Sequence, residues 1–132
     1  MSRKNSREKT MHLLYQMEMR QEYSDEVMDV FFDSSNLKND EKKYIQIKMP
    51  LLLNNKDKID DIIRKFLVDW TFERISKIDL SILRIALFEI EYCEDIPIEV
   101  SINEAVEMAK KYSEIESSKF INGLLGKYTR SK

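Results

Sequence analysis

The chain has 132 residues, of which 42% are hydrophobic and 35% are charged, and its net charge is −2. This length suits one domain with one core, and two glycines and two prolines are too few for the many tight turns of an all-β fold. The single cysteine, Cys93, excludes an internal disulfide and a zinc site built from cysteines. A polar N-terminus and the lack of an apolar run of about 20 residues predict a cytoplasmic protein without a membrane span.

The first half of the chain is predicted to form three helices. Apolar residues at three- and four-residue spacing predict a helix over residues 6–19, and Ser24 followed by two acids predicts a second helix that runs to residue 32. Residues 33–39 are predicted to be a loop. A long helical pattern then covers residues 40–67, and because Pro50 removes one backbone hydrogen bond we expect a kink or a break near residues 48–49.

The second half predicts three further helices. Asp79 suits the N-cap of a helix with a nearly continuous apolar stripe, which we expect to be central. Pro97 suits the first turn of the next helix, and Ser117 or Ser118 the cap of the last. The apolar pattern of the last helix continues through Gly123, so we interpret this glycine as a point of close approach between helices. The result is a compact all-α bundle of six or seven helices, with a predicted core that includes Leu83, Leu87, Ile102, Val106 and Leu124.

Residue patterns typical of catalysis are missing from the sequence. It contains no glycine-rich phosphate or dinucleotide motif and no GxSxG nucleophile motif. The one histidine, His12, has no second histidine or cysteine pair with which to form a zinc site. Paired carboxylates are abundant, but a solvated face explains them in a chain with 24 acids. We therefore expect no cofactor, no metal site and no enzymatic activity.

Positive charge is concentrated at both ends of the chain. Residues 1–9 carry a net charge of +3 and residues 117–132 carry +4, so the stretch between them carries −9. This pattern favours binding of a polyanion to one face, although two solvated tails would give the same composition. Aromatic and amide side chains are mixed with these cations, a combination typical of single-stranded RNA recognition. The alternative for the aromatics Tyr15 and Phe120 is burial in the core.

Three blocks in the second half resemble the NusB family of bacterial transcription antitermination factors. They are residues 82–90 (ILRIALFEI), 96–110 (IPIEVSINEAVEMAK) and 118–125 (SKFINGLL), in the order and spacing of the family. The basic opening at residues 3–7 resembles the arginine-rich N-terminus of the family. Because the resemblance covers essentially the whole chain, it implies that residues 1–132 are a single NusB-like RNA-binding domain made of two helical subdomains.

The resemblance also implies partners. NusB-type proteins pair with NusE, a small-subunit ribosomal protein, and the pair binds boxA RNA in nascent ribosomal RNA transcripts, within an antitermination complex on RNA polymerase. Carried over by position, the RNA-binding residues are Arg3, Lys4, Arg7, Lys119, Phe120 and Asn122. The partner-binding residues are Glu73, Asp79, Arg84 and Glu116.

One departure from the family bears on RNA binding. The N-terminus has fewer arginines than is usual, which implies weaker RNA affinity and greater reliance on the partner. A different class of function, a homodimeric protein-interaction scaffold that hides its basic face, is the alternative. The free protein is accordingly expected to be a monomer or a homodimer.

Overall fold

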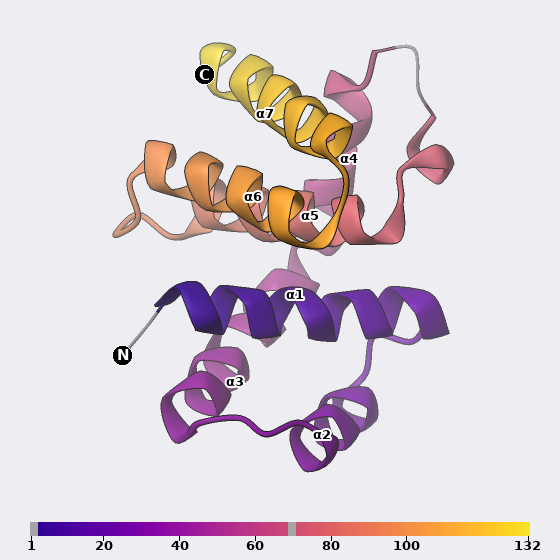
Figure 1. The fold of residues 1–132 in the computed structure, drawn as a ribbon, viewed down its shortest axis with the longest axis vertical. Helices are drawn as coiled ribbons and strands as arrows, with labels where there is room; N and C mark the ends of the chain where they lie inside the picture. The colour runs from indigo at the N-terminus through magenta and orange to yellow at the C-terminus, as the bar shows by residue number, and fades with distance from the viewer. Residues whose placement is uncertain (1–2, 69–70) are drawn as a thin grey trace.

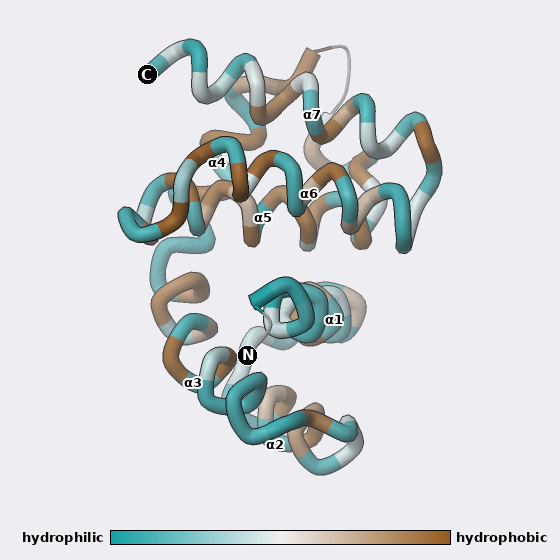
Figure 2. Tube along the Cα trace, turned by 60° about the vertical axis from the view of Figure 1, so that its left-hand side comes forward, coloured by the Kyte–Doolittle hydropathy of each residue, from teal (hydrophilic) through white to brown (hydrophobic). Residues whose placement is uncertain are grey.

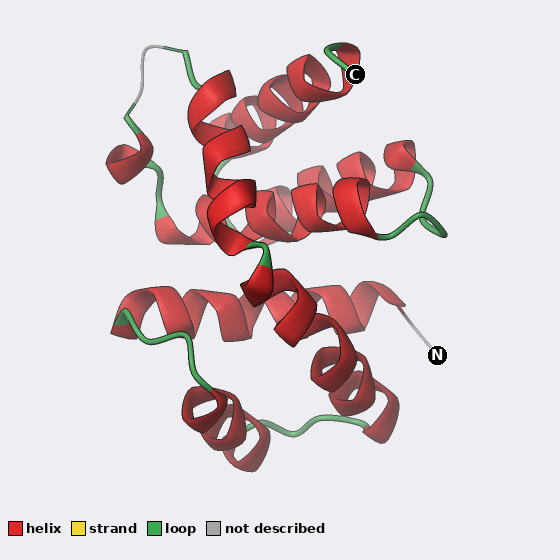
Figure 3. Ribbon diagram, turned by 180° about the vertical axis from the view of Figure 1, so that it is seen from behind, coloured by secondary structure: helices red, strands yellow, loops and turns green. Residues whose placement is uncertain are grey.

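The computed structural model describes residues 3–68 and 71–132, and within them the regular structure is helical throughout (Figures 1 and 3). One short 3₁₀ turn, Phe72–Arg74, precedes the second half. The α-helices are α1 (Arg3–Arg20), α2 (Asp25–Ser34), α3 (Asn39–Asn54), α4 (Lys56–Phe66), α5 (Lys77–Tyr92), α6 (Ile98–Tyr112) and α7 (Ile115–Arg130). The predicted all-α fold, with seven helices in the described residues, is confirmed.

The helices form two stacked halves. Figure 1 shows α1, α2 and α3 in one half, and α5, α6 and α7 with most of α4 in the other. α5 is the central helix, because it contacts α1, α4, α6 and α7. This arrangement matches the two helical subdomains expected from the resemblance. Among the described residues, no helix combines the length and the apolar character needed to cross a bilayer.

The central position of α5 explains its nearly continuous apolar stripe, since every residue from Asp79 to Glu89 is buried, four polar or charged residues included. The helix begins two residues before the predicted start. Its cap is Ser76, whose hydroxyl accepts a hydrogen bond from the backbone N–H of Asp79 at 3.1 Å. The prediction that Asp79 caps this helix is therefore wrong, and Asp79 lies in the first turn instead.

The long helical pattern over residues 40–67 is two helices. α3 passes through the exposed Pro50 and ends at Asn54, and α4 begins at Lys56. The break falls at Asn55, where the backbone leaves helical geometry (φ −112°, ψ 10°) and the side chain donates a hydrogen bond to the carbonyl of Leu51 at 2.9 Å. The break therefore lies at residue 55 and not near residues 48–49.

Three of the five predicted core residues lie in the core. Leu83 and Leu87 are fully buried and Leu124 is nearly so. Ile102 and Val106 are only half-buried, so the prediction for these two is wrong. The reason is the rotation of α6, which turns smaller side chains and one methionine inward. Its buried residues are Ser101, Ala105, Met108 and Ala109.

Candidate functional site

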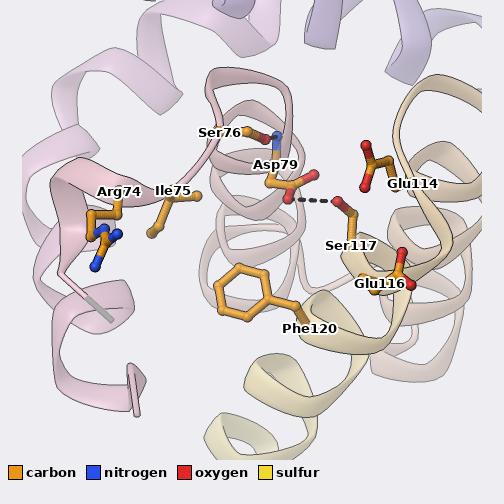
Figure 4. A pocket seen from close by; sticks show the side chains of 8 residues that line it. All are labelled: Arg74, Ile75, Ser76, Asp79, Glu114, Glu116, Ser117 and Phe120. Carbon is orange, nitrogen blue, oxygen red and sulfur yellow. Dashed lines mark hydrogen bonds between the residues drawn. The ribbon is translucent and has the colours of Figure 1, made fainter. Parts of the chain in front are cut away.

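A groove of about 260 Å³ lies beside the starts of α5 and α7 and the 3₁₀ turn (Figure 4). Three carboxylates and one guanidinium line it together with one aromatic ring, and we call it the acidic groove. Its lining residues are Arg74, Ile75, Ser76, Asp79, Glu114, Glu116, Ser117 and Phe120.

Asp79 is the buried charge of the acidic groove, with 7% of its surface exposed. Its Oδ2 accepts a hydrogen bond from the hydroxyl of Ser117 at 2.8 Å, which connects the start of α7 to the start of α5 (Figure 4). Its Oδ1 is buried and accepts no hydrogen bond from a described residue. An unpaired buried acceptor costs roughly 1–3 kcal/mol. Asp79 is therefore suited to accept a hydrogen bond from a donor that enters the groove.

The structure gathers most of the predicted partner-binding residues at this groove. Asp79 and the exposed Glu116 line it, and Glu73 is exposed in the 3₁₀ turn beside the lining residue Arg74. Sequence reasoning missed Ser117, because this residue reaches Asp79 only when α7 packs beside α5. No local pattern in the sequence reveals that contact.

Arg84, the fourth predicted partner-binding residue, points into the protein and is 1% exposed. Its Nε and one terminal nitrogen donate to the two carboxylate oxygens of Asp60 at 2.9 Å, and the other terminal nitrogen donates to Glu18 at 2.8 Å. Burial by itself lowers the pKa of Arg84, but hydrogen bonds to Asp60 and Glu18 outweigh burial and raise it. A direct contact with a partner does not fit this position. Arg84 instead joins α1, α4 and α5.

Arg7 is also buried, although the resemblance placed it at the RNA. Its side chain lies between α5 and α6, where Nε donates to Glu89 at 2.6 Å and a terminal nitrogen lies 3.6 Å from Glu104. Glu89 accepts a second hydrogen bond from Ser101 at 2.8 Å. A phosphate contact does not fit Arg7 in this arrangement. The clue in the sequence was Glu89, an acid within the largely apolar stripe of α5 that also contains Arg84.

The predicted RNA-binding residues of α7 face in two directions. Lys119 and Asn122 are exposed, whereas Phe120 is half-buried, packs against the core and lines the acidic groove. The interpretation of Gly123 as a close-approach point is wrong, because it is exposed and a Cβ there would meet no atom within 4 Å. Lys119 and Asn122 are therefore accessible to a ligand from the side away from the core.

The two ends of the chain reach the same end of α5. Arg3 lies 3.4 Å from Asp95 in the loop after α5, and Lys132 forms an ion pair with Glu91 in the last turn of α5. Lys4 is exposed near this end. Lys119 is in the second turn of α7, so the candidate RNA-binding residues are spread along the protein rather than clustered at one point.

The fold and the sequence can be compared with known proteins. The fold is that of solved NusB structures: T. maritima NusB superposes with a TM-score of 0.87 at 30% identity, covering 98% of this chain and 92% of that chain. A chain from the structure of antitermination factors NusB and NusE in complex with dsRNA also has a TM-score of 0.87, at 24% identity, covering 98% and 97%. Residues 4–130 match the NusB family, to which this chain belongs. The transcription antitermination protein NusB of Clostridium perfringens is 46% identical over 129 residues, 96% of each chain.

Proposed function

We propose that this chain is a transcription antitermination factor that binds boxA-type single-stranded RNA in nascent ribosomal RNA transcripts together with NusE. Membership of the NusB family and a full-length relative described as a transcription antitermination protein support this proposal. In it, residues 1–132 act as one RNA-binding domain in the cytoplasm, within an antitermination complex on RNA polymerase. The domain works by binding and catalyses no reaction.

The acidic groove is the observation that carries the assignment of a protein partner. Three carboxylates line it against one guanidinium, so it repels the phosphates of RNA and attracts a cation or an N–H donor. The unpaired Oδ1 of Asp79 offers such a donor a charge-assisted hydrogen bond. A lysine, an arginine or backbone N–H groups of NusE would satisfy it. We assign Phe120 to this groove, as the apolar wall against which the partner packs.

The RNA is assigned to the exposed cations outside the groove. Lys119 and Asn122 present a charge and an amide on the outer side of α7, and Arg3 and Lys4 add charge at the start of α1. Because these groups are few and spread out, the RNA affinity of the isolated protein would be low, and NusE would supply the remaining contacts.

A titration with RNA, in the presence and absence of NusE, tests this function. We expect RNA binding to be weak without NusE and at least about tenfold tighter with it, which corresponds to about 1.4 kcal/mol of coupling. Asp79→Asn should weaken NusE binding while leaving the melting temperature close to that of the wild type. Asp29→Asn, which removes the same charge from an exposed position on α2, is the matched control. A protein that dimerises and ignores both RNA and NusE would instead support the homodimeric scaffold.

A further inference from the structure

A second cavity, of about 380 Å³, lies near the start of α1, at the other end of this helix from the contact between Glu18 and Arg84. It is formed by the first turns of α1, the connection between α2 and α3, and the end of α6. Figure 2 looks toward this end of α1, with the connection between α2 and α3 below it. Three lysines and two asparagines line the cavity, and we call it the lysine pocket. These residues are Asn5, Lys9, Asn36, Lys38 and Lys111.

Two carboxylates also line the lysine pocket, but both are buried and already hydrogen-bonded. Glu8 accepts hydrogen bonds from the ammonium of Lys111 at 2.9 Å and from the hydroxyl of Tyr112 at 2.7 Å. Glu41 accepts one from the backbone N–H of Lys38 at 3.0 Å. The ammonium groups of Lys9 and Lys38 make no ion pair with a described residue. With three lysines against two carboxylates, the pocket keeps a net charge of +1, and its two lysines without an ion pair come from two different elements.

The charges of the pocket also affect the pKa of the neighbouring His12. Its ring packs edge-on against Tyr112, a wall of the pocket, with ring centroids 5.0 Å apart. Burial lowers the pKa of His12, and the charges of Lys9 and Lys111 lower it further, against the opposing effect of Glu8. The positive charge of the pocket thus outweighs the nearby carboxylate at this position.

We propose that the lysine pocket binds a phosphate group of the RNA backbone, held by Lys9 from α1 and Lys38 from the start of α3. This inference rests on the proposed function and adds a second contact surface to it. None of the RNA-binding residues predicted from the sequence lines this pocket. The RNA would run from the exposed Lys4 at the start of α1 over the α2–α3 connection. The amide group of Asn36 can donate to phosphate oxygens or to the ribose.

RNA affinity measured against salt concentration, with NusE present, tests the contact. Lys38→Gln keeps the backbone N–H that Glu41 requires, so it removes only the charge. We expect Lys38→Gln and Lys9→Gln each to weaken RNA binding several-fold and to lower the log–log salt slope by about 0.7, the value for one phosphate contact on a single strand. Lys58→Gln, at an exposed position on α4, is the control and should change neither. Wild-type affinity and slope in both pocket variants would overturn the inference and leave the proposed function standing.

The single histidine of the chain provides a second, local readout by NMR. A phosphate bound beside Lys9 brings negative charge close to His12, so saturating RNA should raise the pKa of His12 in the wild type and much less in Lys38→Gln. Inorganic phosphate alone distinguishes the source of the anion. If it raises this pKa while RNA does not, the pocket binds free phosphate and the RNA assignment is wrong. If the wild-type protein binds no RNA with NusE present, both the inference and the proposed function are wrong.

Discussion

Arg84 and Arg7 carry their charges inside the protein because acids from other helices meet them there. Arg84 lies between Asp60 of α4 and Glu18 of α1, and Arg7 is paired with Glu89 of α5. An arginine in a sequence indicates a surface charge unless its partners are known, and these partners lie 24 to 82 positions away. Both residues were predicted to be binding residues from the family resemblance, carried over by position. Burial of a paired charge depends on tertiary contacts that residue type and spacing do not contain.

Removing the Arg84 side chain tests its structural role. Arg84→Ala leaves the carboxylates of Asp60 and Glu18 without their main counter-charge, and we expect a loss of about 3–5 kcal/mol in the free energy of unfolding. Urea denaturation measures it. Lys110→Ala is the control, because Lys110 pairs with Glu107 on the exposed surface at 3.5 Å and should contribute less than about 1 kcal/mol. Equal effects of the two changes would contradict this interpretation.

Glu18 makes the stability depend on acid pH. Burial raises the pKa of Glu18, but hydrogen bonds from Tyr23 and Arg84 outweigh burial and lower the pKa to about 2, from an ordinary value of 4.5. A lowered folded pKa means that the folded state binds fewer protons than the unfolded state, so this stabilisation is present above pH 4.5 and is lost as the pH falls toward 2. Urea denaturation across this range should show a shallower loss for Glu18→Gln than for the wild type. Glu94→Gln, at an exposed loop position, should follow the wild type.

At the scale of single elements, α5 was easier to predict than α6. The apolar sequence of α5 is buried on all sides, so an error in its rotation would not expose a core residue. α6 is buried on one side only. Its residues Ser101, Ala105, Met108 and Ala109 are buried, whereas Ile102 and Val106 are half-buried. The periodicity of apolar residues did not separate the fully buried positions of α6 from those at the edge of its buried side.

α3 contains a second departure from sequence-based expectation. Pro50 lacks the N–H that would bond to the carbonyl four residues earlier, yet α3 continues for four residues beyond it. We expect Pro50→Ala to raise the free energy of unfolding by about 1–3 kcal/mol, since proline is about 3 kcal/mol less favourable than alanine inside a helix and part of this is offset in the unfolded chain. Thermal or urea denaturation measures the change. Gln46→Ala, at another exposed position of α3, should stay within about 0.5 kcal/mol of the wild type. A less stable Pro50→Ala variant would show that the proline fits the native backbone.

At the scale of the whole molecule, polar contacts along the length of α1 join the two halves. Arg7 reaches α5, Glu8 reaches α6, and Glu18 reaches Arg84. The sequence predicted the helices and their family, because periodicity and local motifs are properties of a single segment. It did not predict the acidic groove or the lysine pocket as surfaces, because each is built from segments far apart in the chain. The separation between the proposed partner surface and the proposed RNA surface follows from this packing.

Lys119 offers a test of that separation. Ser117 faces Asp79 in the acidic groove, and two residues further along an α-helix the side chain has turned by about 200°, so Lys119 projects away from the groove. Lys119→Gln should therefore lower the log–log salt slope of RNA binding by about 0.7 while leaving NusE affinity unchanged. Asp79→Asn should do the reverse, with weaker NusE binding and an unchanged salt slope for RNA once NusE is saturating.

Lys127→Gln removes the same charge two turns further along α7 and serves as the control. Fluorescence titrations of each variant with RNA and with NusE measure both quantities. If Lys119→Gln weakens NusE binding as much as Asp79→Asn does, the two surfaces are one, and the assignment of the RNA to the outer side of α7 is wrong.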